Sequence, residues 1–242
     1  MPARDMAVVA PAFGPPSAEG PSIPGYLDQV YRWAYGTPRA VETFEREWLV
    51  NAILFGNYAR LRDAALDELG GRLHGLTLQV ACVYGNLTSR LLDRLAPDAR
   101  LDIVDILPIQ LANLRDKLPA DGRVTMRQAD ASALPYADAS VDQLLLFFLL
   151  HEQPEAVRRA TLAEAMRVVR PGGRLVIVDY HRPSALHPMR PLMRLVFRRL
   201  EPYAIDLWRH PVDAFMPRDA APSSRAHTTY FGGLYQKLVI TR

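Results

Sequence analysis

The sequence predicts an α/β fold built on a parallel β-sheet, with a helical cap before it and an antiparallel hairpin at its end. After Gly70-Gly71, short apolar runs alternate with amphipathic segments, as they do where helices connect parallel strands. The stretch VVRPGGRLVIVDY indicates a helix that ends at Pro171, a turn at Gly172-Gly173 and then a strand. Near the C-terminus, Gly232-Gly233 separates two strand-like runs, which predicts the hairpin.

The apolar runs define the expected elements. We expect parallel strands at Thr77–Val83, Leu101–Asp105, Val124–Gln128, Asp142–Leu149 and Arg174–Tyr180, and hairpin strands at His227–Phe231 and Leu234–Thr241. Helices are expected between them at Leu87–Leu95, Ile109–Leu118 and Glu155–Val169. Because such helices cover both faces of a parallel sheet, the strands should be buried.

Composition divides the chain into three parts. Residues 1–25 contain six prolines and three glycines with little apolar periodicity, which is typical of a disordered tail. Residues 26–70 have helical apolar spacing and many aromatic residues, which predicts a helical cap or lid. These aromatic residues either pack the cap on the core or line a pocket for a flat ring. Residues 71–242 form the main domain, with an inserted amphipathic helix within 186–208.

Charge and cysteine content exclude several classes of protein. The net charge of +3 is a small difference between 29 basic and 26 acidic residues, so no nucleic-acid surface is indicated. The single cysteine, Cys82, excludes an intramolecular disulfide framework and fits a reducing cytoplasm. No apolar run is long enough to span a bilayer, so we expect a soluble or peripheral protein.

Two loops at the carboxyl ends of the first expected strands have features of a cofactor site, since ligands of open α/β sheets bind at that edge. The first loop has Gly85 at its turn. The second has Asp105 followed by Ile106, and a carboxylate at this distance downstream accepts hydrogen bonds from ribose hydroxyls in this architecture.

A third loop completes the set. Asp130 can accept a hydrogen bond from an exocyclic amine, and the backbone N–H of Ala131 can face a ring nitrogen. Either Asp105 or Asp130 alone would be read as a helix-cap acid. Both acids in this order, with Gly85 upstream, favour a nucleotide-like cofactor.

The stretches VACVYGNLTSRL, QADASALPYADASVDQ and RVVRPGGRLVIVDY follow one another around Asp105. Together, from about Leu76 to Tyr180, they resemble the class I S-adenosylmethionine-dependent methyltransferases, above all those acting on ubiquinone and menaquinone precursors. The resemblance implies a Rossmann-like class I methyltransferase fold with a seven-stranded, mostly parallel sheet. It also implies S-adenosyl-L-methionine as cofactor, with its ribose held by Asp105 and its adenine by Asp130.

The first loop departs from the pattern of that family, in which an acid is followed by alternate glycines. Here the four positions are Gln79, Ala81, Val83 and Gly85. All departures fall beside the methionine half of the cofactor, while both acids for the adenosine half remain. We therefore expect these four positions to contact a cofactor whose amino-acid arm is held differently, with Val83 and Tyr84 adding bulk where the arm usually lies.

A wider resemblance concerns function. VACVYGNLT, YRWAYGTP and the closing YFGGLYQKLVITR resemble the methyltransferase-like rhodoquinone biosynthesis proteins. That resemblance implies conversion of ubiquinone to rhodoquinone, with S-adenosylmethionine giving the amino group that replaces a ring methoxyl, and a requirement for Mn²⁺. Two alternatives stay open: an ordinary quinone-precursor methyltransferase, and a noncatalytic quinone-binding protein of the same fold.

Candidate catalytic and metal-binding residues follow two later strands. His151 and Glu152 come after one expected strand, and Tyr180 and His181 end the next. Carboxylate and imidazole ligands suit manganese, so the candidate metal ligands are His151, Glu152 and His181, where the metal would polarise the quinone. A structural role for each histidine is an equal alternative. The candidate catalytic residues are His151, Tyr180, His181 and Tyr84, of which Tyr84 either bonds a quinone oxygen or fills space.

The segment 189–200 predicts a basic amphipathic helix. Its apolar residues recur at helical spacing: Met189, Leu192, Met193, Val196, Phe197 and Leu200. Five arginines and no acid occur between Arg182 and Arg199. The helix either covers the core with a solvated face or lies on an anionic membrane. Because ubiquinone resides in lipid, we expect a cytoplasmic protein held peripherally on the inner membrane.

Overall fold

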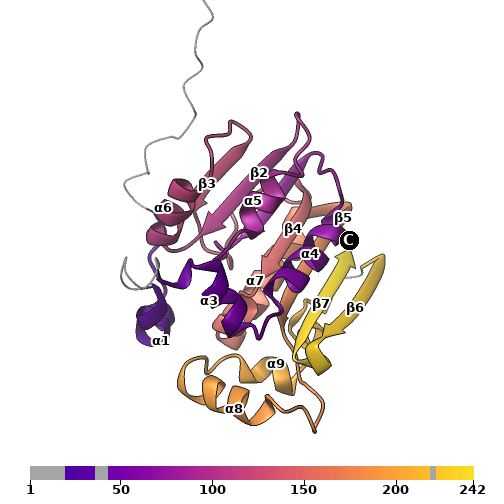
Figure 1. The fold of residues 1–242 in the computed structure, drawn as a ribbon. Helices are drawn as coiled ribbons and strands as arrows, with labels where there is room; N and C mark the ends of the chain where they lie inside the picture. The colour runs from indigo at the N-terminus through magenta and orange to yellow at the C-terminus, as the bar shows by residue number, and fades with distance from the viewer. Residues whose placement is uncertain (1–19, 36–42, 219–221) are drawn as a thin grey trace, which may run out of the picture.

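The computed structural model describes residues 20–35, 43–218 and 222–242. Seven strands form one sheet in the order β3-β2-β1-β4-β5-β7-β6 (Figure 1). The first five pair in parallel, and β7 is antiparallel to both β5 and β6. The strands are β1 (Leu76–Val80), β2 (Arg100–Asp105), β3 (Val124–Gln128), β4 (Val141–Phe147), β5 (Val169–Tyr180), β6 (Ser224–Tyr230) and β7 (Tyr235–Thr241). The predicted fold, including its terminal hairpin, is confirmed.

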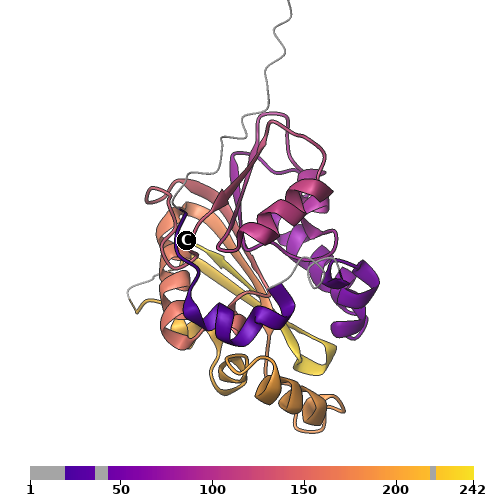
Figure 2. The same ribbon diagram turned by 90° about the vertical axis from the view of Figure 1, so that its left-hand side faces the viewer.

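Helices cover both faces of the sheet (Figure 2). On one face lie α4 (Tyr58–Leu69), α5 (Leu87–Leu92) and α6 (Pro108–Lys117), and on the other lies α7 (Glu155–Val168). Between them the central strands are apolar on both sides, and Leu144, Leu145 and Leu146 of β4 are all buried. This double burial explains the continuous apolar run in the sequence of β4.

The remaining helices gather near the carboxyl ends of the parallel strands (Figure 1). They are α1 (Gly25–Tyr35), α3 (Glu47–Ile53), α8 (Arg190–Arg199) and α9 (Ile205–Arg209), with short 3₁₀ turns at Leu150–Glu152, Val212–Phe215 and Phe231–Gly233. The predicted tail falls mostly on residues 1–19, which lie outside the described residues, as do residues 36–42 of the predicted cap. Within that cap, α4 packs against β5 and β7.

Several predicted boundaries differ from the structure; for example, the first strand ends at Val80 rather than Val83, and β5 begins at Val169 rather than Arg174. Helix α7 ends at Val168, because Val169 already pairs with Val141 and the strand continues through Pro171. The inserted helix is divided into α8 and α9. Pro202 accounts for this break, since a proline disfavours the helical conformation of the residue before it, Glu201.

Candidate active site

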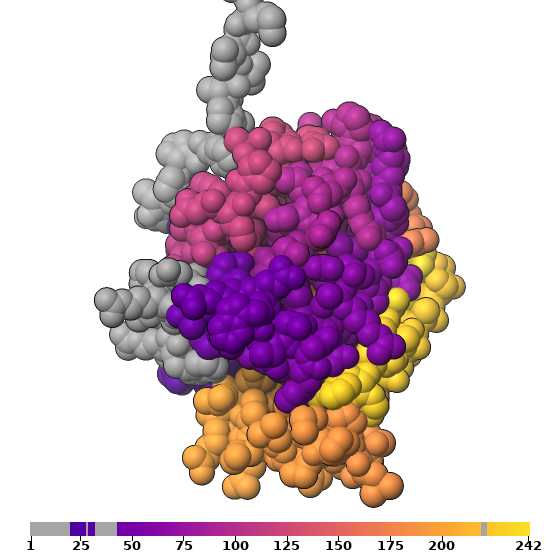
Figure 3. Space-filling view, in the orientation of Figure 1, coloured from indigo at the N-terminus to yellow at the C-terminus, as the bar shows by residue number. Residues whose placement is uncertain are grey.

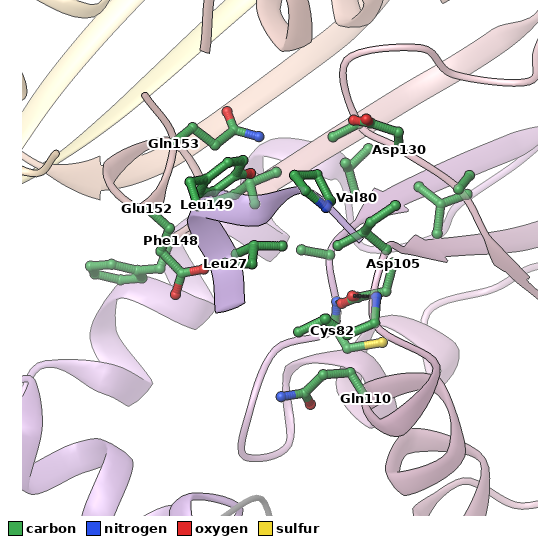
Figure 4. Close-up of a pocket in the computed structure, with 18 residues that line it drawn as sticks. Leu27, Val80, Cys82, Asp105, Gln110, Asp130, Phe148, Leu149, Glu152 and Gln153 are labelled. Atoms are coloured by element: carbon green, nitrogen blue, oxygen red, sulfur yellow. Dashed lines mark hydrogen bonds between the residues drawn. The ribbon is translucent and has the colours of Figure 1, made fainter. Parts of the chain in front are cut away.

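A cavity lies at the carboxyl ends of the first strands, and we call it the strand-end cavity (Figure 4). Its walls come from the loops after β1, β2 and β3 and, on the other side, from α1 and the segment after β4. Five of the predicted cofactor-binding residues line it: Ala81, Asp105, Ile106, Asp130 and Ala131.

The Asp105 side chain connects the end of β2 to the first loop through a hydrogen bond. Its Oδ2 accepts a hydrogen bond from the backbone N–H of Cys82 at 2.7 Å, and its Oδ1 accepts one from the N–H of Leu107 at 2.8 Å. Figure 4 shows the Asp105 carboxylate directly beside Cys82. Burial raises the pKa of Asp105 to about 6, although these amide donors lower it. Each carboxylate oxygen has a second lone pair, so the group keeps the capacity to accept from a ribose hydroxyl.

Asp130 is fixed on a different wall of the same cavity (Figure 4). Its Oδ1 accepts hydrogen bonds from the backbone N–H and the hydroxyl of Ser132, at 2.8 and 2.7 Å. Ala131 lines the cavity beside it. The two carboxylates therefore face one cavity from separate loops, as predicted for ribose and adenine.

Two residues of the first loop have a left-handed backbone: Ala81 with φ of 74° and Gly85 with φ of 81°. At Gly85 a Cβ atom would lie 2.6 Å from Oη of Tyr58, so glycine is needed for space as well as conformation. That hydroxyl donates to the carbonyl of Tyr84 at 3.2 Å and accepts from the N–H of Leu87 at 3.0 Å. Ala81 adopts a left-handed conformation that glycine adopts without strain, and this lowers the stability of the fold by about 1–2 kcal/mol.

Gln79 belongs to β1 and lies beneath the first loop. It is not among the residues that line the strand-end cavity. Its side chain is fully buried; Nε2 donates to the carbonyl of Ala81 at 3.0 Å, and Oε1 accepts from the hydroxyl of Thr88 at 3.0 Å. A carboxylate at this position could not donate to Ala81. The glutamine and the left-handed alanine are therefore coupled, and a contact of Gln79 with a cofactor stays a prediction.

The tip of the loop is also held by residues far away in the sequence. Glu45 Oε1 accepts from the N–H of Gly85 at 3.1 Å and forms an ion pair with Lys117. Lys117 Nζ donates to the carbonyl of Gly85 at 2.7 Å. Tyr84 Oη accepts from Gln110 Nε2 at 2.8 Å. The N–H of Gly85, which could otherwise meet an anionic group of a ligand, is thus already bonded to a carboxylate.

A second cavity adjoins the first, and we call it the apolar cavity. Cys82, Phe148 and Glu152 line both cavities. The apolar cavity has a volume of about 170 Å³, compared with about 70 Å³ for the strand-end cavity. Its walls are mostly aromatic and aliphatic, and include Tyr31, Phe44, Ile53, Val83, Tyr84 and Phe147. A flat apolar ligand there would lie next to a ligand in the strand-end cavity.

His151 and Asp179 form a buried pair at the wall of the apolar cavity. His151 Nδ1 lies 3.0 Å from Asp179 Oδ1, and the other carboxylate oxygen accepts from the N–H groups of Leu150 and His151 at 2.9 and 3.3 Å. Burial lowers the pKa of His151, but the charge and hydrogen bond of Asp179 outweigh it and raise the pKa to about 9. The contact with Asp179 therefore favours the protonated imidazole, and His151 lines the apolar cavity.

Three further polar groups share that wall: Glu152, Tyr180 and Glu201. Glu152 Oε1 lies 4.0 Å from His151 Nε2. Oε2 of Glu201 is buried and, among the described residues, has no hydrogen-bond partner. Burial raises the pKa of Glu201, although the nearby charge of His151 lowers it. A polar cluster thus faces an otherwise apolar cavity.

Comparison with known protein families shows what this part of the chain is similar to. Residues 77–173 match the family described as methyltransferase domain. The match runs from β1 into β5 and includes the three loops that line the strand-end cavity.

Curated relatives of this chain are named as quinone biosynthesis enzymes. The chain is 34% identical over 139 residues to the ubiquinone/menaquinone biosynthesis C-methyltransferase UbiE of Dinoroseobacter shibae, covering 54% of this chain and 53% of the relative. It is 31% identical over 140 residues to the protein of the same name from Stutzerimonas stutzeri, covering 56% and 54%. The chain therefore spans about half the length of the curated relatives it matches.

Solved structures share the fold of this chain. The geranyl diphosphate C-methyltransferase of Streptomyces coelicolor A3(2) covers 90% of this chain and 98% of its own, with 14% identity and a TM-score of 0.57. An O-methyltransferase family protein from Burkholderia thailandensis covers 84% and 62%, with 19% identity and a TM-score of 0.58. The predicted Rossmann-like class I methyltransferase fold is confirmed, and at these identities the likeness concerns the fold alone.

The acceptors of the strand-end cavity suit the ribose and adenine of S-adenosylmethionine, the cofactor that the family resemblance implies. Asp105 and Asp130 offer acceptors to a ribose and an adenine, and the loop after β1 supplies the wall between the two cavities. Val83 and Tyr84 line the apolar cavity, so the side chains predicted to displace the amino-acid arm lie on the substrate side. The individual contacts of these residues with the cofactor stay predictions.

The predicted manganese ligands do not fit a metal site. His181 Nδ1 bonds the carbonyl of Gly233 at 2.8 Å and its ring lies beside His227, so it does not join His151 and Glu152. His151 Nδ1 is engaged by Asp179 Oδ1 at 3.0 Å. Within the described ranges, no three His, Cys, Asp or Glu side chains are arranged to hold a metal ion. The prediction of this triad is wrong.

Sequence reasoning found His151, Tyr180 and Tyr84 at the apolar cavity but missed two residues that shape the site. Tyr58 braces the first loop through its hydroxyl, and Glu201 places a carboxylate in the cavity wall. Neither residue belongs to a motif, and both act across long sequence distances. The sequence near Glu201 contains one local signal: Pro202 follows it and indicates the end of a helix.

Proposed function

We propose that this protein transfers a group from S-adenosylmethionine to the ring of a polyprenyl quinone. The specific reaction that we propose is the conversion of ubiquinone to rhodoquinone, in which an amino group from the cofactor replaces a ring methoxyl. The observation that carries this proposal is the contact of His151 Nδ1 with Asp179 Oδ1 at 3.0 Å, because His151 lines an apolar cavity that adjoins the strand-end cavity.

The apolar cavity suits a quinone ring. Phe44, Phe147 and Phe148 offer faces and edges to a flat ring, and Ile53 and Leu54 offer aliphatic contacts. Only a few polar groups interrupt these walls, which is typical of sites that orient a largely apolar ligand. His151 is placed among them to donate to a carbonyl oxygen.

The charge of His151 favours addition to a quinone. An imidazolium that donates to a quinone carbonyl withdraws electrons from the ring, so that a ring carbon becomes open to an uncharged amine. As the ring carbon–nitrogen bond forms, the electron pair would move to that carbonyl; when the carbonyl re-forms, methoxide would leave and take the proton lost by the nitrogen. To free the amino group, the bond between this nitrogen and the cofactor's Cα would then break, with its electron pair going to the nitrogen and a Cβ proton being lost, so that the rest of the cofactor leaves as an α,β-unsaturated acid. Methylation of a ring carbon needs the opposite, a base that makes the ring electron-rich.

The first loop supports a changed orientation of the cofactor's amino-acid arm. Gln79 bonds Ala81 and Thr88, and the N–H of Gly85 bonds Glu45, so these groups are already engaged. When bound, S-adenosylmethionine supplies the amino group, and Glu152, which lines both cavities, offers a carboxylate to it. These contacts would hold the arm toward the apolar cavity.

C-methylation of a quinone precursor is the second candidate. The names of the curated relatives favour it, and it uses the same two cavities. It predicts that His151 loses its proton when substrate binds, because a ring hydroxyl must be deprotonated. The altered first loop has no explanation in this candidate.

Product analysis with the purified protein separates these readings. The protein is incubated with S-adenosylmethionine and ubiquinone, or with a demethylated quinone precursor, each with and without Mn²⁺. An aminoquinone supports amination, and a methylated precursor supports the second candidate. Absence of both products under all conditions would show that the domain is not an enzyme of either kind. Because the predicted metal ligands do not gather, no step of the proposal depends on manganese.

A further inference from the structure

Helix α8 exposes apolar residues on the side away from the core. Met193 and Phe197 are buried, whereas Leu192 is 45% and Leu195 is 53% exposed. Because successive residues are about 100° apart around a helix, Leu195 lies nearly opposite Phe197. Leu186, just before the helix, is 95% exposed. The predicted single apolar row is thus divided between the core and the surface.

Arginines surround these leucines. Arg194, Arg198 and Arg199 are exposed on α8, and no acidic residue occurs between Arg182 and Arg199. Arg190 and Arg194 also line a surface hollow together with Leu186. This face therefore presents aliphatic side chains and guanidinium groups together, with no nearby carboxylate from its own segment to neutralise them.

Helix α3, which borders the apolar cavity, also exposes apolar side chains. Trp48 and Ile53 of α3 are 66% and 43% exposed. Ile53 lines the apolar cavity, and so does Glu201, which follows α8. In Figure 3 the α3 region and the α8–α9 region meet on one face of the molecule. The cavity therefore lies between two elements that expose apolar side chains.

We propose that Leu186, α8 and the exposed side chains of α3 dock the protein on an anionic phospholipid bilayer. The leucines enter the boundary between headgroups and acyl chains, and the arginines bind lipid phosphates. Trp48 suits the interface because its ring is amphipathic. None of the described helices is long and apolar enough to cross a bilayer, so contact is confined to one surface. Entry of a quinone from this membrane rests on the proposed function; the docking itself does not.

Flotation with vesicles tests the docking. The full chain is mixed with vesicles of phosphatidylglycerol and phosphatidylcholine, or of phosphatidylcholine alone. We expect binding to the anionic vesicles that falls at high salt. The Arg194→Gln/Arg198→Gln variant should bind about 25-fold more weakly, since each arginine near an anionic surface contributes about fivefold. The Leu192→Gln/Leu195→Gln variant should lose on the order of tenfold.

A matched control is Arg90→Gln/Arg100→Gln, which removes the same charge from exposed positions on α5 and β2. It should bind like the wild type, and circular dichroism should show all variants folded. Absence of binding to anionic vesicles, equal binding to neutral vesicles, or equal loss in the control would each overturn the proposal. The proposal would also be overturned if the leucine variant bound vesicles like the wild type but sedimented differently as the free protein. The exposed leucines would then form an interface between copies of the chain.

The failure of this proposal is distinguishable from failure of the proposed reaction. Activity on a quinone with a short, water-soluble tail should be unchanged in the α8 variants, while activity on a long-tailed quinone in vesicles should fall with binding. An unaltered response to the long-tailed substrate would show that the bound surface is not the route of entry.

Discussion

His151 Nδ1 lies 3.0 Å from Asp179 Oδ1, and the two side chains are buried together at the wall of the apolar cavity. The carboxylate ends β5 and the imidazole follows β4, so two neighbouring strands determine this contact. This contact determines whether the His151 imidazole at the apolar cavity acts as an acid or as a base.

The pair makes stability depend on pH. The pKa of His151 is raised from 6.5 to about 9, so between these values the folded protein binds a proton that the unfolded chain has lost. The free energy of unfolding should therefore fall as pH rises from about 6.5 to 9, by about 3 kcal/mol. Urea unfolding across this range measures it. His151→Asn should remove this fall, and an unchanged slope in that variant would contradict the assignment.

Ala81→Gly should stabilise the protein. The left-handed backbone of Ala81 costs about 1–2 kcal/mol, and the greater freedom of glycine in the unfolded chain offsets about half of the gain. Thermal unfolding should show a net gain of up to about 1 kcal/mol. Gly85→Ala is the matched opposite: it meets Tyr58 and should destabilise by more than about 2 kcal/mol. Destabilisation by Ala81→Gly would show that the alanine methyl group packs favourably.

Gln79→Glu tests the coupling within the first loop. A carboxylate cannot donate to the carbonyl of Ala81, so one buried hydrogen bond is lost and the unfolding free energy should fall by about 1–3 kcal/mol. Restoring the acid of the family pattern should therefore weaken the loop rather than improve it. A more stable or equally stable Gln79→Glu variant would show that the loop rearranges around the acid.

Asp130→Asn tests the adenine end of the strand-end cavity. The asparagine keeps one acceptor for Ser132 but replaces the second carboxylate oxygen by a donor, so the affinity for S-adenosylmethionine should fall about 10- to 100-fold. Isothermal titration calorimetry measures it. Asp138→Asn is the control, because Asp138 is exposed and pairs with Arg167 outside the cavity lining. Equal losses in both variants would rule out a specific contact of Asp130.

The sequence predicts the sheet and both acids of the strand-end cavity because these depend on local patterns. Apolar strands, a glycine turn and an acid after each strand follow one another within short stretches, as Asp105 and Asp130 do. No local pattern in the sequence predicts the left-handed backbone of Ala81. This conformation depends on the hydrogen bond from the Gln79 side chain and on the turn that follows.

Long-range contacts account for the other errors. His181 follows Tyr180 by one residue, yet β5 ends there and His181 turns toward Gly233 and away from His151. A motif of neighbouring His and Glu residues therefore suggested a metal site that tertiary structure does not assemble. Likewise, the apolar row of α8 could not be divided between core and surface without knowing which side packs on Trp208 and Tyr180.

The proposed amination of ubiquinone can be tested directly by tracing the cofactor's nitrogen into the quinone product. The purified protein is incubated with ubiquinone and S-adenosylmethionine that has nitrogen-15 in its α-amino group, and the quinones are analysed by mass spectrometry. We expect an aminoquinone that contains nitrogen-15 and has lost one methoxyl group. Transfer of the cofactor's methyl group, without nitrogen-15 in any quinone, would contradict it.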